Sequence, residues 1–503
     1  MTTASRRNAR RLQANLAIVR VAERAVREEV RYRRFEIAVT HAELAARFAS
    51  QRHGGRFASV TLERCLEEVG QATVAGGSAT GGKGVLHVST RAVGMGGHTQ
   101  WVRRIIEGDT TRCHSVVLTG PEREPFPSDL AQAIERSGGK IHRLVATGAK
   151  PGGAKPGGRI ERARALRDLA LQFDLVMLSS DPADAVPSVA FAPPRHGLPV
   201  ARLNHADHIF WLGAAVSDVL IEFRPVGARF SVARRGYPAE RIETLRLPVD
   251  VPATVPRAQA RQQLKLSEDA FVVISIGAPY KFEGFQGPGY IDIVTPVLEA
   301  IPGLTIVTVG PPQAGAWAEA VETFAPRLRL HPPARDLSPF FAASDAFLNP
   351  TPIGSDTVLW EAAASGLPII TMRPERPGLE LLRGDPAAAE GVALVPEGSL
   401  GLAEAISSLL VSPGLASELG ARARDLVTRE RVGAAWRAHL AEVMTASSQA
   451  PPMTADQLVA CDFSEEVDAY VASWASVGSL RKALVRRVRK RAGATRRTRT
   501  TDN

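Results

Sequence analysis

The chain has 503 residues, is 45% hydrophobic and 6% aromatic, and carries a formal net charge of +10. This length exceeds what one hydrophobic core usually supports, so we expect two domains, and the apolar and aromatic content is typical of a soluble globular protein. Cys65, Cys113 and Cys461 are too few and too far apart for a disulfide framework or a zinc site, and no run approaches the roughly 18 apolar residues of a membrane span.

The positive charge lies at the two ends of the chain. Residues 1–40 hold ten Arg and four Glu, and residues 479–503 hold ten Lys or Arg and one Asp, so these ends carry +6 and +9. The rest of the chain therefore carries −5 of the +10 total. This distribution argues against a nucleic-acid-binding body and for basic ends that meet an anionic surface. The Arg-rich start lacks the apolar stretch of a signal peptide, so we expect a cytoplasmic protein.

Residues 1–74 are predicted to form an N-terminal helical extension, with a long helix over 9–50 and a second near 59–71. The apolar positions of the long helix follow a heptad-like seam that Glu23 and Arg33 interrupt. The seam consists of Leu12, Leu16, Val19, Val26, Val30, Ile37 and Leu44. It fits a helix packed on the body, a homodimeric coiled coil or a basic amphipathic helix on lipid, and we favour the first two.

A Gly-rich linker at 75–84 precedes an N-terminal domain, residues 85–250, in which short apolar strands alternate with helices. The predicted strands are Val85–Ser89, Ser115–Leu118, Lys140–Val145, Leu175–Ser179, Val200–Asn204, Val219–Ile221 and Ile242–Leu245. A glycine-rich turn at 94–99 follows the first strand, and a helix is predicted over 100–107. This alternation predicts a doubly wound, Rossmann-like α/β domain.

A second domain of the same kind is predicted over residues 251–430, after a Pro-, Ala- and Gln-rich linker that runs to Gln263. Its strands are Phe271–Ile276, Leu304–Val309, Leu328–Leu330, Ala346–Leu348, Pro368–Thr371 and Val392–Val395. Its helices are Tyr290–Ala300, Ala314–Phe324, Leu337–Ala343, Thr357–Ser365 and Gly401–Leu410. Two Rossmann-like domains that face a cleft bind ligands in that cleft by default.

Residues 415–446 are predicted to be helical, and residues 431–503 to be closing helices and a basic tail. Leu480, Leu484, Val485 and Val488 line one face of the tail amid Arg and Lys. Such a segment fits an anionic bilayer surface, or a solvated tail without a partner.

A helix in the second domain carries an unexplained carboxylate. Ser355 or Asp356 is expected to cap the helix and Gly366 to supply the left-handed turn after it. Glu361 stands inside it among Val, Leu, Trp and Ala residues. A helix N-terminus receives phosphate well, and a carboxylate one turn further can accept hydrogen bonds from two ribose hydroxyls. The alternative is a solvent-facing Glu on an ordinary crossover helix.

Several motifs together resemble the GT-B glycosyltransferases, whose two Rossmann-like domains bind a nucleotide-sugar. The Glu361 helix with Gly366-Leu367-Pro368 resembles the donor-site helix of that superfamily and its exit. The segments 236–242 and 247–250 are similar to the close of the N-terminal domain in the large retaining family 4-like (group 1) enzymes. Asp336–Asp345 resembles the segment before the donor loop. The resemblance spans residues 85–444. It implies a GT-B fold, with Gly96, Gly97, Lys281, Gly354, Ser355, Asp356, Thr357 and Glu361 as donor-binding residues.

Two departures from the retaining family stand out. Ile353 occupies the position of a second glutamate that contacts the donor sugar, and Ala278 replaces an Arg that grips the diphosphate, which leaves Lys281 as the cation. Gly354–Glu361 and the turn Gly96-Gly97-His98 instead resemble the donor loop and first glycine-rich loop of the peptidoglycan lipid N-acetylglucosaminyltransferase. The sequence of the donor site is therefore expected to indicate well where the nucleotide binds, but to predict poorly which sugar the nucleotide carries.

Three residues of the first domain are candidate catalytic groups. In inverting relatives a residue in the loop of His98 acts as a base, and in retaining relatives a His at the position of His205 hydrogen-bonds the donor sugar. Asp207 or His208 would orient His205 or hold the acceptor. Both histidines could instead be satisfied structural residues, but a cluster this polar is unusual for a core. We expect no metal here, because no further ligand cluster accompanies Asp207.

The resemblance implies transfer of a hexosyl or N-acetylhexosaminyl group from a nucleotide-diphosphate sugar to the hydroxyl of a glycan, glycolipid or protein, with no other cofactor. We favour a retaining enzyme of envelope or extracellular polysaccharide or glycolipid synthesis, at the inner face of the plasma membrane. A nucleotide-sugar epimerase of the same fold and a non-catalytic binding protein are the alternatives. A dinucleotide-dependent oxidoreductase is disfavoured because Thr99 replaces the third glycine of its fingerprint and no acidic residue ends the second strand.

Overall fold

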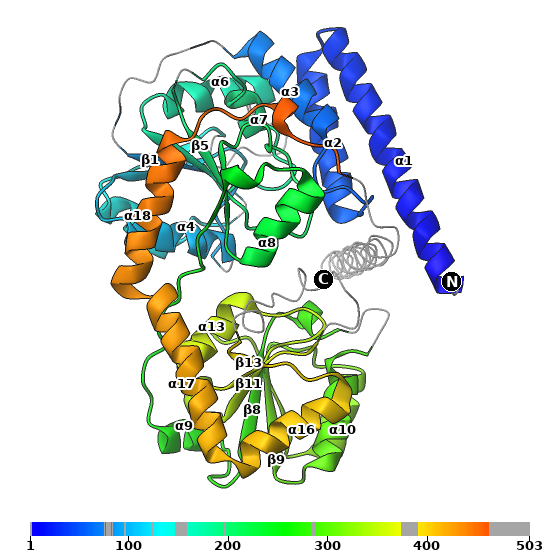
Figure 1. The fold of residues 1–503 in the computed structure, drawn as a ribbon, viewed down its shortest axis with the longest axis vertical. Coiled ribbons are helices and arrows are strands. Elements are labelled where there is room, and N and C mark those ends of the chain that lie inside the picture. The colour runs from blue at the N-terminus through cyan, green and yellow to red at the C-terminus, as the bar shows by residue number, and fades with distance from the viewer. Residues whose placement is uncertain are drawn as a thin grey trace, which may run out of the picture. The chain divides into compact units, whose positions relative to one another are not determined.

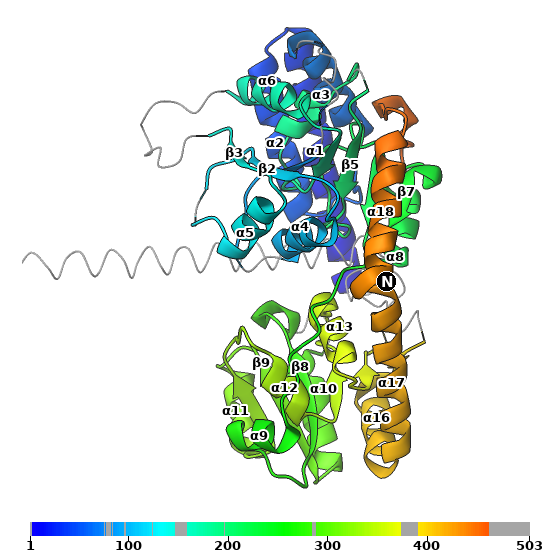
Figure 2. The ribbon, with the colours of Figure 1, turned by 90° about the vertical axis from the view of Figure 1, so that its left-hand side faces the viewer.

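The computed structural model describes residues 3–74, 76, 82, 84–94, 97–122, 124–145, 158–195, 197–283, 288–373 and 391–461. The chain divides into two compact units (Figure 1). Unit 1 comprises residues 1–222, 228–243 and 444–503, and unit 2 comprises residues 223–227 and 244–443. Each unit is built around one parallel sheet with helices on its faces (Figure 2).

The sheet of unit 1 has seven strands in the order β3-β2-β1-β4-β5-β6-β7. The strands are β1 Val85–Ser89, β2 His114–Leu118, β3 Ile141–Arg143, β4 Leu175–Leu178, β5 Val200–Leu203, β6 Val219–Glu222 and β7 Ile242–Thr244. Neighbours from β3 to β6 pair in parallel. The seven strands expected from the apolar runs are all present. The strands β1, β2, β4, β5 and β6 are buried along their whole length, as central parallel strands are, whereas the edge strands β3 and β7 are only partly buried.

The helices of unit 1 cover this sheet and extend beyond it. They are α1 Thr3–Arg31, α2 Phe35–Gln51, α3 Val60–Thr73, α4 Gly97–Gly108, α5 Ser128–Arg136, α6 Arg159–Ala170 and α7 Val186–Ala190, while α8 Pro225–Phe230 and the short η1 Ser231–Arg235 and η2 Ala239–Arg241 follow β6. Side chains of α2, α3, α6 and α7 form one core with β1, β4 and β5. The N-terminal helices therefore share the main core of unit 1.

The predicted long helix over 9–50 is wrong in one respect, because it is two helices. Arg33 adopts a left-handed conformation (φ 55°), and the chain turns between α1 and α2. The seam of α1 packs inside unit 1, and Glu23 on that seam is buried, where it accepts hydrogen bonds from Ser59 and Arg56. Of the three roles considered for the seam, the structure shows packing on the body for its α1 part. The seam is wrong for α2, where Ile37 and Leu44 are exposed, because the turn at Arg33 changes which face of the helix meets the core.

Carboxylates of the N-terminal helices cap distant parts of unit 1. Glu36 accepts hydrogen bonds from the backbone N–H groups of Arg159 and Ile160, at the start of α6, over 2.7 and 3.1 Å. Glu63, which is buried, accepts from the N–H groups of Gly213 and Ala215 over 2.9 and 3.0 Å. These backbone N–H groups have no partner within a helix or strand, and the two carboxylates satisfy them. The N-terminal helices are therefore an integral part of unit 1.

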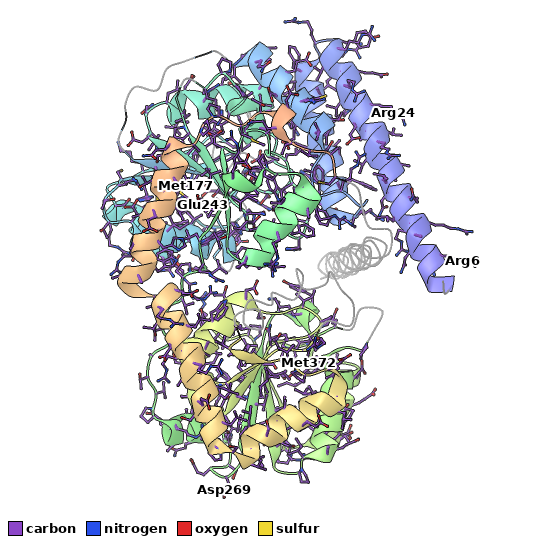
Figure 3. The ribbon with its side chains drawn as sticks, viewed as in Figure 1. Arg6, Arg24, Met177, Glu243, Asp269 and Met372 are labelled. Carbon is purple, nitrogen blue, oxygen red and sulfur yellow. The ribbon has the colours of Figure 1, made fainter. Side chains whose placement is uncertain are left out.

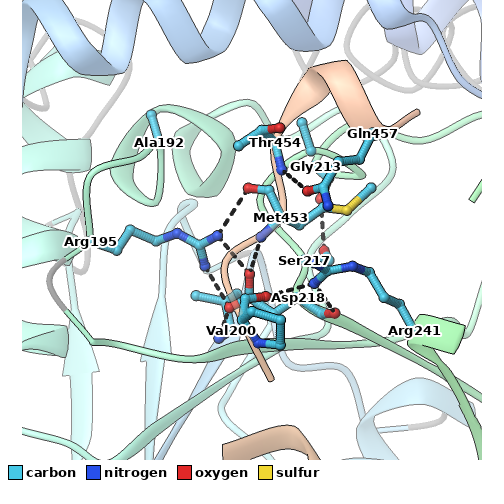
Figure 4. A network of polar contacts seen from close by, with 12 residues as sticks. Ala192, Arg195, Val200, Gly213, Ser217, Asp218, Arg241, Met453, Thr454 and Gln457 are labelled. Atoms are coloured by element: carbon cyan, nitrogen blue, oxygen red, sulfur yellow. Dashed lines mark hydrogen bonds and ion pairs between the residues drawn. The ribbon is translucent and has the colours of Figure 1, made fainter. Parts of the chain in front are cut away.

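The end of the described chain returns to unit 1 through a buried ion pair (Figure 4). Both guanidinium Nη atoms of Arg195 donate to the Asp218 carboxylate, over 2.8 and 2.7 Å. The same carboxylate accepts from the N–H of Met453 and from the N–H of Val200 at the start of β5. One paired carboxylate thus joins β5 to the C-terminal segment, in which the short helix η4 Ala455–Gln457 follows.

The sheet of unit 2 has six strands in the order β10-β9-β8-β11-β12-β13. They are β8 Phe271–Ile276, β9 Leu304–Val309, β10 Leu328–His331, β11 Ala346–Leu348, β12 Ile369–Ile370 and β13 Ala393–Leu394. The helices are α9 Arg257–Gln263, α10 Tyr290–Ala300, α11 Ala316–Phe324, α12 Ser338–Ala343, α13 Asp356–Ala364, α16 Gly398–Val411 and α17 Pro413–Glu430, with the short η3 Pro279–Lys281, and α18 Gly433–Gln449 leads back to unit 1. Two cores, one on each face, hold α9, α12, α13 and α17 on one side and α10, α11 and α16 on the other.

Two expectations about unit 2 need correction. The linker expected up to Gln263 contains helix α9, because Arg261 is buried and donates hydrogen bonds to Asp345 and to several carbonyl groups. The helical stretch expected over 415–446 is present as two helices, α17 and α18, because the chain turns at Gly433 (φ 69°). The predicted basic tail and most of the Gly-rich linker lie outside the described residues. No described helix alone is long and apolar enough to cross a membrane, and α16 with α17 reaches that measure only as a pair bent by 103°.

Candidate functional site

The strand order of unit 2 reverses beside β8. The chain moves from β8 outward to β9 and β10 and then returns to place β11 on the other side of β8. Loops that leave neighbouring strands at such a point diverge, which opens a crevice outside their carboxyl ends. The loop after β8 contains Lys281, and the loop after β11 leads into α13, so the predicted donor residues of unit 2 gather at this point.

Lys281 holds the loop before α13 in place. Its Nζ donates to the carbonyl oxygen of Gly354 over 2.7 Å and to Oγ of Ser355 over 3.2 Å. Asn349, buried at the end of β11, accepts from the backbone N–H of Ser355 over 2.8 Å. Burial lowers the pKa of Lys281, while the nearby Asp356 carboxylate opposes that shift. A cation and a helix N-terminus therefore lie together at the carboxyl ends of β8 and β11.

Gly277 makes this arrangement possible. A Cβ at this position would lie 3.0 Å from Oγ of Ser355, 3.1 Å from Cδ of Lys281 and 3.3 Å from Cγ of Pro350. The first residue after β8 must therefore be small if the lysine and the serine are to approach each other. Sequence reasoning did not select Gly277 or Asn349, although both directly follow a predicted strand.

The start of α13 differs in detail from the expected cap. Ser355 occupies the N-cap position, but its side chain makes no capping hydrogen bond and instead accepts from Lys281. Asp356 and Thr357 form the first turn and are half-buried. Glu361 is half-buried in the second turn, and Gly366 has the left-handed conformation (φ 80°) expected after the helix. The order of groups along α13 is thus helix N-terminus first and carboxylate one turn later.

In unit 1 the structure brings His98 and His205 together. His98 lies in the first turn of α4 and His205 follows β5, and their ring centroids are 5.1 Å apart. Burial, with His98 and Arg202 nearby, lowers the pKa of His205 to about 3, and its Nδ1 is buried without a hydrogen-bond partner. Burial also lowers the pKa of His98, which Asp181 opposes. Near neutral pH both rings are therefore neutral imidazoles, which can exchange hydrogen bonds with a ligand but carry no charge.

Asp207 lies in a buried polar cluster beside His205. Its carboxylate is 3.2 Å from Nδ1 of His208, and its backbone carbonyl accepts from the buried guanidinium of Arg235. Glu222, at the end of β6, accepts from Asn204 over 2.7 Å. Burial, and then the neighbouring Asp207, raises the pKa of Glu222. Asp207 therefore shares its surroundings with a second carboxyl group that sequence reasoning did not select.

The strand order of unit 1 reverses between β1 and β4, and polar groups meet there as well. Thr90 donates to Asp184 over 2.6 Å, and Arg91 pairs with Asp181 over 2.6 Å. These residues were missed, although each follows a predicted strand within a few positions. Gly97 begins α4, whereas Gly96 lies outside the described residues. No group of three or more His, Cys, Asp or Glu in the described part of the chain is placed to bind a metal ion.

Comparisons with known proteins agree with this fold. The family model "Glycosyl transferases group 1" matches residues 289–412, which contain α13 and its loop. The structure is similar to HepE from Anabaena in complex with UDP (TM-score 0.55, 15% identity, 72% of this chain and 100% of that chain), and to a glycosyltransferase from Rickettsia africae (0.54, 11%, 73% and 98%). It is also similar to sucrose-phosphate synthase from Thermosynechococcus elongatus (0.51, 18%, 73% and 98%). No curated protein sequence matches the chain.

These findings define the fold class as GT-B. Residues 289–412 match the group 1 glycosyltransferase family model, and the resemblance to GT-B glycosyltransferases expected from the sequence is confirmed. The local similarity to the peptidoglycan lipid N-acetylglucosaminyltransferase stays a prediction, as do the roles of the individual site residues.

Proposed function

We propose that this protein transfers a sugar from a nucleotide-diphosphate donor to a hydroxyl acceptor, and that unit 2 binds the donor. The observation that carries this proposal is the arrangement at α13, where Lys281 and the helix N-terminus lie one turn before Glu361. This arrangement lies largely within the segment that matches the group 1 glycosyltransferase model. The similar HepE structures, solved with UDP and with UDP-glucose, support a uridine nucleotide as the first donor to test.

The donor site would work through charge and hydrogen bonding. The N–H groups at the start of α13 and the ammonium of Lys281 would hold the diphosphate and stabilise the negative charge that grows on it as the glycosidic bond breaks. Glu361 would accept hydrogen bonds from the two ribose hydroxyls. Ile353, half-buried in the loop before α13, offers the sugar no hydrogen bond from its side chain. Sugar recognition would then depend on other residues.

Unit 1 would supply groups that meet the acceptor and the donor sugar. We assign His98 to the acceptor hydroxyl and His205 to a hydrogen bond with the donor sugar, because the two rings approach each other at the carboxyl side of the sheet and are neutral. A neutral imidazole can accept a proton from an acceptor hydroxyl or hydrogen-bond a sugar. We favour a retaining reaction, in which no base is required, with Asp207 as a positioning group, and we expect no cofactor besides the nucleotide-sugar.

Calorimetry with UDP tests the donor site directly. Glu361→Ala should weaken UDP binding by about 10-fold or more, since a lost hydrogen bond to a charged group costs about 1.5–3 kcal/mol. The matched control is Glu322→Ala, which removes an exposed glutamate from α11 of the same unit. If Glu361→Ala and the control bind UDP equally, α13 is not the ribose site.

A panel of nucleotide-sugars tested by thermal shift would identify the donor, because a ligand that binds the native state raises the melting temperature. Incubating the stabilising donor alone then separates the remaining possibilities. Epimerisation needs no acceptor, transfer gives at most slow hydrolysis without one, and a non-catalytic binder releases no nucleotide under any condition. The basic ends of the chain support a lipid-linked or polysaccharide acceptor at the cytoplasmic membrane face as the first acceptor class to test.

A further inference from the structure

Helix α1 has a second, outward face that the core of unit 1 does not use. The inward face is buried through Leu12, Leu16, Val19, Val26 and Val30. The outward face carries an exposed apolar stripe, which consists of Ala14, Ala17, Ile18 and Val21. These positions have the i, i+3, i+4, i+7 spacing of one helix face, and Ile18 and Val21 are 49% and 59% exposed. A helix that packs on its own core has no need of this stripe.

Arginines surround the stripe. Arg10 lies one turn before Ala14, and Arg24 lies one turn after Val21. The exposed arginines of α1 are Arg6, Arg7, Arg10, Arg20, Arg24, Arg27 and Arg31, against one exposed glutamate, Glu28. Figure 3 shows Arg6 and Arg24 at the outer side of α1. The free face of the helix is therefore strongly cationic with an apolar centre.

We propose that this face of α1 lies on an anionic membrane surface. Aliphatic side chains between guanidinium groups are the pattern of a helix that rests in the headgroup region, where the apolar stripe enters the lipid and the arginines meet the phosphates. At 29 residues the helix is about 43 Å long, so several lipid headgroups can contact it at once. The proposal is independent of glycosyl transfer.

Two other occupants fit this face less well. A second copy of the chain, related by a two-fold axis, would set the arginines of one α1 against those of the other, and like charges repel. A nucleic acid would meet the arginines, but the stripe of Ala14, Ile18 and Val21 would then press against phosphates and gain nothing. An anionic bilayer satisfies both the charge and the apolar stripe.

Co-sedimentation of the full chain with vesicles tests the proposal. Vesicles of phosphatidylcholine containing about 30% phosphatidylglycerol are compared with pure phosphatidylcholine. The full chain should bind only the anionic vesicles, and the combined variant Arg10→Gln, Arg20→Gln, Arg24→Gln should bind on the order of 100-fold more weakly, because each arginine near the surface contributes about a factor of five. The matched control, Arg335→Gln, Arg429→Gln, Arg437→Gln, removes three exposed arginines from unit 2 and should bind like the unaltered chain.

A second variant separates the apolar contribution from the charge. Ile18→Ser with Val21→Ser leaves the charge unchanged and should weaken binding most clearly at about 0.5 M salt, where electrostatic attraction is screened. Equal binding by the three-arginine variant and its control would overturn the proposal and assign vesicle binding to another part of the chain. Sedimentation velocity without lipid provides the other refuting result, since a dimer that the serine variant dissociates would show that α1 binds a second copy.

Discussion

The neutral His205 makes a prediction about stability that can be worked out from the structure. In the folded protein the pKa of His205 is lowered to about 3 from an ordinary value of 6.5, mainly by burial. Because the folded pKa is lowered, the unfolded chain binds a proton first as the pH falls. The stability that the neutral ring contributes is therefore present above about pH 6.5 and is lost progressively between about pH 6.5 and pH 3.

The magnitude follows from these two pKa values. A shift of one pKa unit corresponds to about 1.4 kcal/mol. At pH 5, protonation of His205 in the unfolded chain therefore lowers the free energy of unfolding by about 2 kcal/mol, whereas at about pH 7.5 it lowers it by almost nothing. In His205→Gln the site no longer titrates. When the pH falls from 7.5 to 5, the unaltered chain should therefore lose about 2 kcal/mol more of its free energy of unfolding than His205→Gln loses.

Urea unfolding of the full chain at the two pH values measures this difference, with the transition of unit 1 followed. Ser89→Ala is a matched control, because Ser89 is buried in the same unit and does not titrate, and its effect should be the same at both pH values. A His205→Gln difference that does not change with pH would show that the pKa of His205 in the folded protein is close to its ordinary value, and would refute the lowered pKa on which this prediction rests.

Four further substitutions test the donor loop, the turn after α13 and a buried carboxylate of unit 1. Gly277→Val should weaken UDP binding by about 10-fold or more in calorimetry, because its side chain would displace Ser355 and Lys281; unchanged binding would show that Lys281 is not needed there. Gly366→Ala should lower stability by about 1–3 kcal/mol in urea, since φ is 80° and the new Cβ would lie 2.0 Å from Nη2 of Arg424; a loss below that range would mean that the turn relaxes. Glu63→Ala should cost about 3 kcal/mol or more, because two buried N–H groups lose their acceptor, whereas Glu63→Gln, which keeps one acceptor oxygen, should cost less; equal losses would contradict the capping role.

Much of the fold could be predicted because its signals are local. Every strand in the described part of the chain was expected from an apolar run, and most of these strands are buried, as parallel strands with apolar residues on both faces are. The left-handed turn at Gly366 was expected because it depends on one residue, a glycine, which adopts a positive φ without a steric penalty. The breaks at Arg33 and Gly433 were not expected, because a turn of a few residues hardly interrupts a long helical pattern.

The site was predicted only in outline. Lys281 and Ser355 were selected, but their contact across 74 positions was not, and it changes the role of Ser355 from a helix cap to a partner of the lysine. Gly277 and Asn349 were missed because their importance lies in what stands next to them. Glu222 directly follows the strand predicted over 219–221 and was not selected, and only the fold places it beside Asp207.

The succession of strands and helices, the two Rossmann-like units and the position of the α13 loop could all be predicted, because they follow from periodicity and from the conformational limits of single residues. Which polar groups meet could be seen only in the folded chain. Glu36 reaches the start of α6 over 123 positions, and His98 approaches His205 from a different strand end. The tertiary structure also decided that one face of α1 is buried and the other is free. Such contacts depend on chain closure over long distances, which no local pattern records.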